Sequence, residues 1–283
     1  MAENVSDAFA ASLGAGEMIF YQNACMEINM QIKVYENSLR AESCKDFLGT
    51  SRLVSRFAEV ILLPIPSTRD GVTLNGCEIP LLDAVSYADE DTLVVGYGIP
   101  DEATEVLSSF GSTVCDIAKD EGFLLANAEL TALGALSVIL DSEKRAPRDI
   151  AVGIAGYGRI GRVLADRLMY LGTRVRIFST REALRMELAS LGIESAAFPV
   201  RQEELIGLDI LVNTAPCEVF SADAQPEGEV RIIDLASGAR FPEGVTVERY
   251  PSLPARAFPE SAGRILGESV ERFLLLGGAF GEV

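Results

Sequence analysis

The stretch DIAVGIAGYGRIGRVLADRLMYLG, residues 149–172, decides the fold of the second half of the chain. An apolar run typical of a buried strand ends at Ala155, and a glycine-rich turn then opens a segment with apolar residues at helical spacing. A strand, a GxGxxG turn and a helix in this order predict the first βα unit of a dinucleotide-binding domain.

The three glycines of the turn each have a physical task in such a unit. Gly156 permits the tight turn, Gly158 lets a pyrophosphate approach the backbone, and Gly161 lets the helix pack closely on the strand. The helix N-terminus then stabilises the anion, and Arg159 could reach the same phosphates. The alternative is a glycine-rich turn that binds nothing. The residues of the turn predicted to bind the cofactor are Gly156, Tyr157, Gly158, Arg159, Ile160 and Gly161.

Apolar runs on both sides of this unit predict the remaining strands. Three precede it, at 59–67, 91–100 and 114–118, and four follow it, at 173–179, 193–199, 208–216 and 230–237. Helical patterns and turns rich in Gly, Pro or small polar residues separate these runs, which predicts βα units and parallel sheets. We therefore expect an α/β protein in which a doubly wound parallel Rossmann domain follows a smaller parallel domain.

The longest apolar segment, 123–140, lies between the two groups of strands. It carries Asn127, Glu129 and Thr131 and ends at a charged stretch, so we expect a buried helix rather than a membrane span. Residues 18–35 could hold one or two further strands. The expected divisions are 1–125 for the N-terminal domain, 126–258 for the dinucleotide-binding domain and 259–283 for a C-terminal helix that starts with Pro259 and is capped by Ser261.

The residues after the second strand of the dinucleotide-binding domain bear on the choice of cofactor. Sites that prefer NAD place Asp or Glu about 20 residues beyond the glycines to bind the ribose 2′-hydroxyl. This chain has Ser179, Thr180 and Arg181 instead, and two hydroxyls with a guanidinium suit a 2′-phosphate. We therefore predict NADP as the cofactor. The alternative is that Ser179 or Thr180 caps the next helix and Arg181 is solvated.

Two later loops should complete the cofactor site, because ligands of open α/β sheets bind outside the carboxyl ends of the strands. The loops that begin at Asn213 and Asp234 follow apolar strands, and we expect them to border the nicotinamide ribose. Ordinary strand-to-helix turns are the alternative for any single residue. The residues predicted here are Thr214, Ala215, Pro216, Ala236 and Ser237.

Composition excludes several classes of function. The 283 residues include no histidine, which removes imidazole-dependent hydrolases, His-ligated zinc enzymes and dehydrogenases that move a proton with an imidazole. A net charge of −18 argues against nucleic acid or an anionic membrane as a partner. The five cysteines are scattered and the first residues do not form a signal peptide, so we expect no metal site and a cytoplasmic location.

The order of motifs resembles that of the A subunit of dipicolinate synthase. The resemblance extends over roughly residues 57–276, and the first 56 residues carry no match. The matching segments are LLPIPST (62–68), GVTLNG (71–76), VVGYGIP (94–100), NAELTALGA (127–135), GYGRIG (156–161), LVNTAP (211–216), IIDLAS (232–237) and PSLPARAFPESAGRIL (251–266).

The resemblance implies a flavodoxin-like N-terminal domain, a Rossmann domain, a cleft between them and a C-terminal helix that packs back on the N-terminal domain. It implies NADP-dependent oxidation of a dihydrodipicolinate-type precursor, a small dicarboxylate, to pyridine-2,6-dicarboxylate, and the partner that it implies is a flavoprotein-like B subunit. We also expect a homo-oligomer. By position, the resemblance matches Asn127 and Thr131 to the start of the family's shared helix, and Ser67, Thr68, Gly71, Pro254 and Arg256 to two of its loops.

The chain departs from the family pattern in the substrate half. Gly238, Ala239 and Arg240 stand where the family has Pro-Gly-Gly, Leu133 replaces an acidic residue, and Glu260 changes the tail motif. These departures leave open another small carboxylate substrate, or a non-catalytic NADP-binding subunit or sensor. A D-2-hydroxyacid-dehydrogenase-like enzyme shares the GxGRxG turn but needs a histidine, and a pure interaction module has only the charge in its favour.

A dicarboxylate substrate needs cationic partners and a proton acceptor. Arg240, Arg256 and Arg69 are the best candidates to bind carboxylates, although an arginine is more often a solvated surface group. Without histidine the acceptor must be Glu129, Asp70, a tyrosine or water. The predicted catalytic residues are Asn127, Thr131, Arg240 and Arg256, and Arg159, Arg181, Arg240 and Arg256 should form a local cationic cleft.

Overall fold

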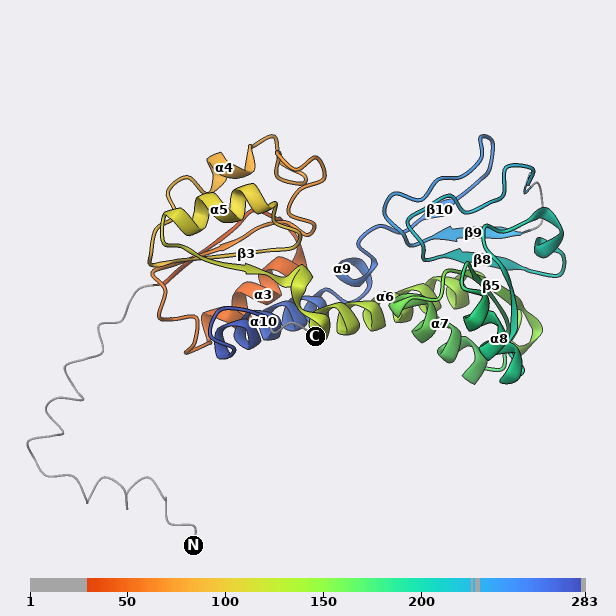
Figure 1. Ribbon diagram of the computed structural model, residues 1–283. Helices are drawn as coiled ribbons and strands as arrows, with labels where there is room; N and C mark the ends of the chain where they lie inside the picture. The colour runs from red at the N-terminus through yellow and green to blue at the C-terminus, as the bar shows by residue number, and fades with distance from the viewer. Residues whose placement is uncertain (1–29, 225, 227–229, 281–283) are drawn as a thin grey trace, which may run out of the picture.

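The computed structural model describes residues 30–224, 226 and 230–280 as two α/β domains joined by a long helix (Figure 1). Each domain is built on a parallel sheet. Loops at the carboxyl ends of both sheets meet in the space between the domains. The expected α/β class and the two-domain arrangement are confirmed.

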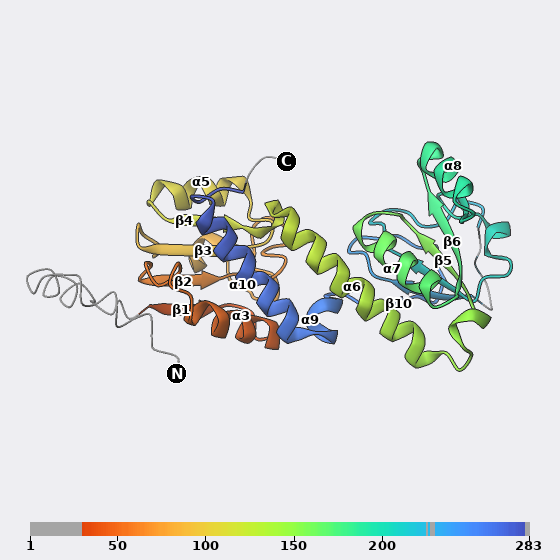
Figure 2. The same ribbon diagram turned by 90° about the horizontal axis from the view of Figure 1, so that it is seen from below.

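The N-terminal sheet has four strands in the order β1-β2-β3-β4. They are β1 (Gln31–Val34), β2 (Glu59–Leu62), β3 (Thr92–Gly96) and β4 (Thr113–Asp116). Helices α4 (Leu81–Ala84) and α5 (Asp101–Ser109) cover one face, and α3 (Leu39–Gly49) and α10 (Pro259–Leu275) cover the other (Figures 1 and 2). The three predicted strands are confirmed, and β1 lies within 18–35, most of which falls outside the described residues.

Helix α10 follows the second domain in the sequence but packs on α3 of the first (Figure 2). A Cβ at Gly267 would collide with the Phe47 ring, so glycine permits the close approach of the two helices. The buried Asp120 carboxylate accepts hydrogen bonds from Ser269 Oγ at 2.6 Å and from Arg272 Nη2 at 2.8 Å, which fixes the far end of α10. The expectation that Ser261 caps this helix is wrong, because α10 begins at Pro259 and Ser261 lies inside its first turn.

The second sheet has the order β10-β9-β8-β5-β6-β7, and all its strand pairs are parallel. The strands are β5 (Ala151–Ala155), β6 (Arg174–Ser179), β7 (Glu194–Ala197), β8 (Ile210–Asn213), β9 (Arg231–Asp234) and β10 (Glu248–Arg249). The strand order reverses between β5 and β8, the switch point at which doubly wound sheets bind ligands. Strand β10 was not predicted, because a strand of two residues is too short to show a hydrophobic pattern in the sequence.

One face of this sheet is covered by α6 (Glu121–Ser142), α7 (Arg159–Tyr170) and α8 (Glu182–Ser190), and the other by loops (Figure 1). Short 3-10 turns lie at Ile117–Lys119, Pro147–Asp149 and Gln202–Leu205. Helix α6 is long and apolar enough to cross a membrane by length and composition. It packs instead against α7, α9 (Leu253–Ala257) and α10, and the expected boundary after residue 125 falls inside it. The domains are therefore joined by a continuous helix.

Candidate functional site

The glycine turn joins β5 to α7 at the switch point of the second sheet. Gly156 has φ +98°, in the left-handed region, and a Cβ there would lie 2.8 Å from Thr214 Oγ1. A Cβ at Gly161 would collide with the carbonyl oxygen of Gly156. A Cβ built on Gly158 has no neighbour within 4 Å among the described residues, so this backbone faces open space. The turn therefore fits the approach of a pyrophosphate to the N-terminus of α7.

A pocket of about 300 Å³ lies between this turn and the end of β6. It is lined by Gly156, Tyr157, Gly158, Phe178, Ser179, Thr180, Arg181, Phe198, Ala215 and Cys217. Seven of these ten were predicted to bind the cofactor, whereas Phe178, Phe198 and Cys217 were missed. These three lie at or just beyond the carboxyl ends of β6, β7 and β8, so the strand pattern alone could have found them. Ile160 packs instead on the core beneath α7.

The end of β6 carries more positive charge than the sequence motif indicated. The Arg181 amide donates to Ser179 Oγ at 3.2 Å, and Thr180 and Arg181 are exposed. Arg185 Nη1 donates to the Ser179 carbonyl oxygen at 2.6 Å, which holds a second guanidinium beside the pocket. Helix α8 has Arg181 at its N-cap, so the alternative in which Ser179 or Thr180 caps the helix is wrong. Arg185 was missed because it lies inside a helix.

Three loops at the switch point are tied together by buried polar groups. Thr214 Oγ1 lies 3.1 Å from the Ala155 carbonyl oxygen and 3.2 Å from that of Gly156. Asn213 Nδ2 donates to Asp234 Oδ1 at 2.8 Å, and both side chains are buried. The Ala236 amide donates to the same carboxylate oxygen at 3.1 Å. The loops after β5, β8 and β9 therefore form one rigid edge.

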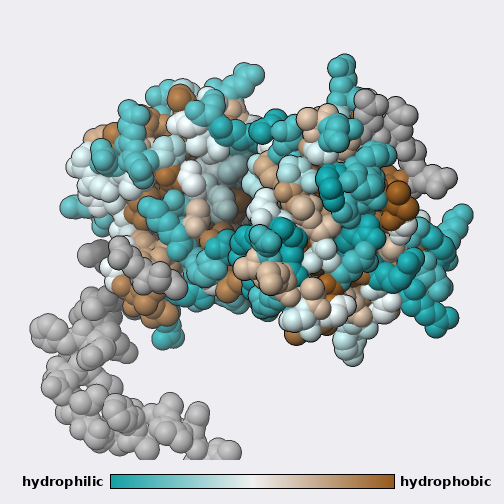
Figure 3. All heavy atoms as spheres, turned by 45° about the vertical axis from the view of Figure 1, so that its right-hand side comes forward, coloured by the Kyte–Doolittle hydropathy of each residue, from teal (hydrophilic) through white to brown (hydrophobic). Residues whose placement is uncertain are grey.

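A second pocket, of about 260 Å³, lies between the domains on the β9 and β10 side of the switch point. Its lining residues are Arg69, Asp234, Leu235, Ala236, Ser237, Gly238, Ala239, Arg249 and Pro251. Arg69 comes from the loop after β2, and the others are the last residues of β9 and β10 and residues of the loops that follow these strands. A recess separates the two halves of the molecule in the space-filling view of Figure 3. The predicted residues Ala236 and Ser237 line this pocket, whereas Arg249 was not predicted.

The predicted catalytic residues lie on α6, on α9 and in the loop after β9. Asn127 and Thr131 share one face of α6, where Thr131 Oγ1 donates to the Asn127 carbonyl oxygen at 2.7 Å. The Arg256 guanidinium lies 5.8 Å from the Tyr250 ring centroid, and Arg240 pairs its backbone with Glu218. Neither pocket is lined by any of these four residues, nor by Pro216 or Thr214.

The four arginines of the expected cationic cleft have different partners. Arg159 is held by Glu121 at the start of α6, with Nε and Nη2 donating to the two carboxylate oxygens at 2.9 and 2.7 Å. This hydrogen bonding lowers the pKa of Glu121 and raises that of Arg159. Arg159 therefore contacts α6, Arg181 lines the first pocket, and the Arg240 amide donates at 3.0 Å to the carbonyl oxygen of Cys217, which lines the same pocket. The physical reason is that an acidic chain offers carboxylate partners to most of its arginines.

Two of the candidate proton acceptors are committed to other contacts. Glu129 Oε1 lies 3.1 Å from Arg167 Nη2. Glu129 comes eight residues after Glu121 on α6, and Arg167 comes eight residues after Arg159 on α7, so this ion pair lies farther along both helices than the Glu121–Arg159 pair. Since a helix rises 1.5 Å per residue, Glu129 lies about 12 Å from the end of α7 that faces the cofactor. Asp70 Oδ1 accepts from the amides of Val72 and Thr73 and from Thr68 Oγ1, which holds its pKa far below the usual range. A weak base that organises its own loop is a poor proton acceptor.

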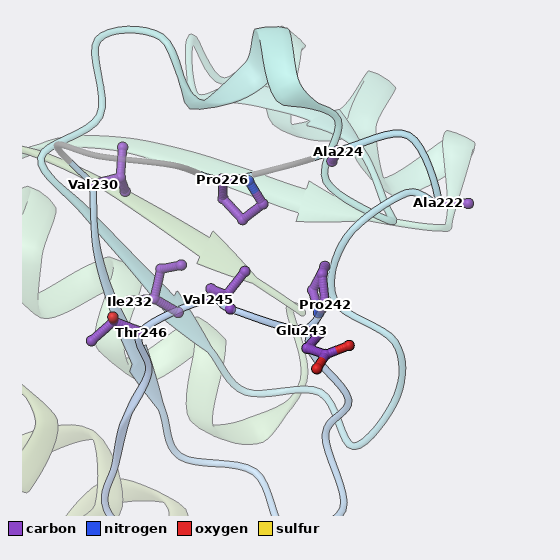
Figure 4. A pocket seen from close by; sticks show the side chains of 10 residues that line it. Ala222, Ala224, Pro226, Val230, Ile232, Pro242, Glu243, Val245 and Thr246 are labelled. Carbon is purple, nitrogen blue, oxygen red and sulfur yellow. The ribbon is translucent and has the colours of Figure 1, made fainter.

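A larger hollow, of about 620 Å³, lies at the outer edge of the second domain (Figure 4). Its labelled side chains are mainly those of Ala, Val, Ile and Pro, with Glu243 as the charged one. Its described lining residues include no basic side chain and no GxGxxG turn, and they lie mainly in the segments that precede β9 and β10, whereas the switch-point loops follow the carboxyl ends of the strands. We therefore place the candidate site at the two smaller pockets.

The order of the second sheet and the glycine turn define a Rossmann domain. Comparison with family models and with curated proteins gives no match. Among solved structures, the chain is similar to the A subunit of dipicolinate synthase from Bacillus halodurans, with 19% identity and a TM-score of 0.68 over 88% of this chain and 99% of that one. It is also similar to the corresponding chain of dipicolinate synthase from Bacillus subtilis, with 17% identity and a TM-score of 0.67 over 87% and 95% of the two chains.

A transhydrogenase from Sinorhizobium meliloti is similar at 17% identity and a TM-score of 0.56, over 88% of this chain and 94% of that one. The resemblance to the dipicolinate synthase family that the motifs indicated is therefore confirmed in the fold, which this chain also shares with the transhydrogenase.

Proposed function

We propose that this chain is an NADP-dependent oxidoreductase that oxidises a small dicarboxylate of the dihydrodipicolinate type in the space between its domains. The observation that carries the proposal is the pair of pockets on the two sides of the β5/β8 switch point. A dinucleotide lying across that point has its adenosine half in the first pocket and its nicotinamide half toward the second.

The residues present fit such a cofactor. The backbone of Gly158 is open to a pyrophosphate, and the end of β6 offers Arg181 and Arg185 to a ribose 2′-phosphate. When bound, the nicotinamide supplies an acceptor for a hydride from the substrate ring. The chain's own contribution is to orient that ring at the edge formed by Ala236 and Ser237 and to balance the charge of its carboxylates.

The cofactor part is tested by fluorescence titration with NADPH and NADH. We expect the chain to bind NADPH more tightly than NADH. The double variant R181Q/R185Q should weaken NADPH binding by about tenfold or more and leave NADH binding nearly unchanged, because NADH lacks the 2′-phosphate. R148Q is the matched control, since Arg148 lies at the amino end of β5. Equal or tighter binding of NADH to the wild-type chain overturns the choice of NADP.

The reaction is tested by generating dihydrodipicolinate in situ with NADP+ and following the ultraviolet absorption of the aromatic product. The assay is run with the chain alone and with a co-expressed flavoprotein-like B subunit, the partner that the family resemblance suggests. Product formation in either arm supports the proposal, and gel filtration of the same samples tests the expected homo-oligomer. We place this reaction in the cytoplasm.

A second candidate function is a non-catalytic NADP-binding subunit or sensor, or an oxidoreductase for another small carboxylate. The ion pair of Glu129 with Arg167 and the hydrogen bonds that hold Asp70 in its own loop favour it, because both carboxylates are engaged in contacts within the protein. NADPH binding without product in either arm of the assay would support this second candidate.

A further inference from the structure

A small apolar groove lies on the N-terminal domain, where the loop after β2 meets the starts of α4 and α5. These two helices cover the face of the sheet opposite α3 and α10 (Figure 1). The groove has a volume of about 180 Å³, below that of pockets for drug-sized ligands, which suits a few apolar side chains rather than a cofactor. The apolar residues of its lining are Val72, Pro80, Leu81, Leu82, Pro100 and Ala103.

The loop after β2 is folded on itself, which fixes one wall of the groove. The amide of Leu81 donates to the carbonyl oxygen of Val72 at 2.8 Å, and the amide of Val72 donates to Asp70 Oδ1 at 2.9 Å. The side chains of Val72, Ile79 and Leu82 are nevertheless 64, 41 and 38% exposed. Apolar side chains that a fixed backbone holds at the surface indicate a preformed contact surface.

The surface around the groove is strongly acidic. Between residues 70 and 118 the sequence has ten Asp or Glu residues and neither Lys nor Arg. Six of the ten lie on the loop after β2, on α4 or on α5, and all six side chains are exposed. They are Asp70, Glu78, Asp83, Asp101, Glu102 and Glu105. An apolar groove surrounded by carboxylates, with no cation from the same segment, is complementary to a partner of positive charge.

We propose that this groove docks a cationic segment of a partner protein, with an apolar side chain in the groove and Lys or Arg side chains on the surrounding carboxylates. A bare cation or a polyamine would leave the apolar lining exposed to water. Nucleic acid and anionic lipid carry the same sign of charge as the groove, and a symmetric dimer through this face would bring two acidic surfaces together.

The place of the groove gives such docking a consequence for the rest of the molecule. The loop after β2 lines the groove through Val72 and lines the pocket between the domains through Arg69. A docked partner therefore contacts a segment that also lines that pocket. The docking surface itself does not depend on the proposed function, because it contains no residue of the cofactor edge.

The test is fluorescence-anisotropy titration of three labelled, amidated peptides with the full chain. The first peptide has two leucines between two pairs of arginines. In the second peptide serines replace the leucines, and in the third glutamates replace the arginines. We expect the wild-type chain to bind the first peptide at least tenfold more tightly than either of the others. This binding should weaken as salt is added, because screening reduces the attraction of exposed charges.

Two double variants separate the two parts of the surface. E102Q/E105Q removes two carboxylates of α5, and V72S/L82S removes two exposed apolar side chains of the lining. We expect the affinity for the first peptide to fall by about fivefold or more in E102Q/E105Q and by about tenfold or more in V72S/L82S. The loss in E102Q/E105Q should shrink at high salt, whereas the loss in V72S/L82S should persist.

E42Q/D46N is the matched control, because it removes the same charge from exposed positions of α3, on the opposite face of the sheet. No binding of the first peptide by the wild-type chain, equal binding of the first two peptides, or an equal loss in E42Q/D46N overturns the proposal. Sedimentation tests the other occupant: if V72S/L82S converts a wild-type dimer into a monomer and the first peptide does not bind, the groove lies between copies of the chain and the proposal is wrong. NADPH affinity and urea unfolding of each variant should match the wild type, which separates a loss of docking from a loss of the fold or of the cofactor site.

Discussion

The cofactor edge of the Rossmann domain and the pocket between the domains are built in different ways. The cofactor edge consists of one strand, turn and helix that are contiguous in sequence, and Asn213, Thr214 and Asp234 lock the neighbouring loops to it. The pocket between the domains joins Arg69 to residues far along the chain, at the carboxyl ends of β9 and β10. The first site is therefore fixed by a single domain, whereas the second depends on how two domains are held together.

The largest effects should come from the glycines of the cofactor edge. Gly161→Ala forces a methyl group onto the Gly156 carbonyl, so we expect the free energy of unfolding to fall by about 1–3 kcal/mol and NADPH binding to be lost. Gly158→Ala meets open space at a negative φ, so it should fold as the wild type does and still lose at least tenfold in NADPH affinity. Urea unfolding and fluorescence titration measure both quantities.

Gly49→Ala in α3 is the matched control, because no atom lies near its added methyl group and it is far from the cofactor edge. Gly161→Ala should therefore reduce both the free energy of unfolding and the NADPH affinity, whereas Gly158→Ala should reduce the NADPH affinity alone. If Gly158→Ala binds NADPH as tightly as the wild type, the cofactor edge does not receive a pyrophosphate at this backbone.

The second prediction concerns the buried pair that locks the edge. Asn213→Ala removes the amide that donates to Asp234 and leaves a buried carboxylate with fewer donors. We expect a loss of about 1–3 kcal/mol in the free energy of unfolding, because unsatisfied buried polar groups carry a desolvation penalty. Urea unfolding of the variant is compared with that of Asn37→Ala, an exposed position. A loss no greater than in Asn37→Ala would mean that the loops are held by other contacts.

The same contrast explains what could be predicted from the sequence. Strands, helices and the glycine turn of the Rossmann domain follow from local apolar patterns, and so does the loop pair at Asn213 and Asp234. The position of Arg249 in the pocket between the domains could not be predicted, because it lies on a two-residue strand without a pattern and faces Arg69 from the other domain across the same pocket. Arg159 was placed in the right turn, but its ion pair with Glu121 depends on the packing of α6 beside α7.

The predicted catalytic residues show the same limit. Asn127, Thr131, Arg240 and Arg256 were carried over by position or chosen by charge, without knowledge of which loops meet across the domains. The structure instead brings together Arg69 and Arg249. Motif order predicts the fold, whereas the composition of a site between domains requires the relative placement of the domains.

The third prediction concerns the contact between Asp120 and α10. Burial raises the pKa of Asp120, but hydrogen bonds from Arg272 and Ser269 outweigh it, so the pKa in the folded state lies below the ordinary value. The hydrogen bonds from Arg272 and Ser269 therefore stabilise the fold at pH values above the pKa of Asp120 in the unfolded state, about 3.9. This contribution is lost as the pH falls through the pKa of Asp120 in the folded state.

R272Q should lower the free energy of unfolding at neutral pH by about 1 kcal/mol. The free energy of unfolding should also fall less steeply in R272Q than in the wild type as the pH is lowered, because the variant has less of this interaction to lose. Urea unfolding across a pH series measures both changes. R264Q on the same helix is the control, because Arg264 is exposed and lies 3.8 Å from Glu268. A pH profile for R272Q that parallels the wild type would show that Asp120 does not hold α10.

The smallest expected effect lies where the two regions meet. Arg159 belongs to the cofactor turn but is bound by Glu121 of α6, so the carboxylate competes with a phosphate for the same guanidinium. Glu121→Gln should therefore tighten NADPH binding by about two- to fivefold at low salt, and Arg159→Gln should weaken it by a similar factor, since exposed ion pairs contribute little. The difference should shrink as salt is added, because screening weakens the attraction of exposed charges. Fluorescence titration at two ionic strengths measures it. If Glu121→Gln weakens NADPH binding instead, the ion pair positions Arg159 for the phosphates, and the cofactor edge depends on the arrangement of the domains after all.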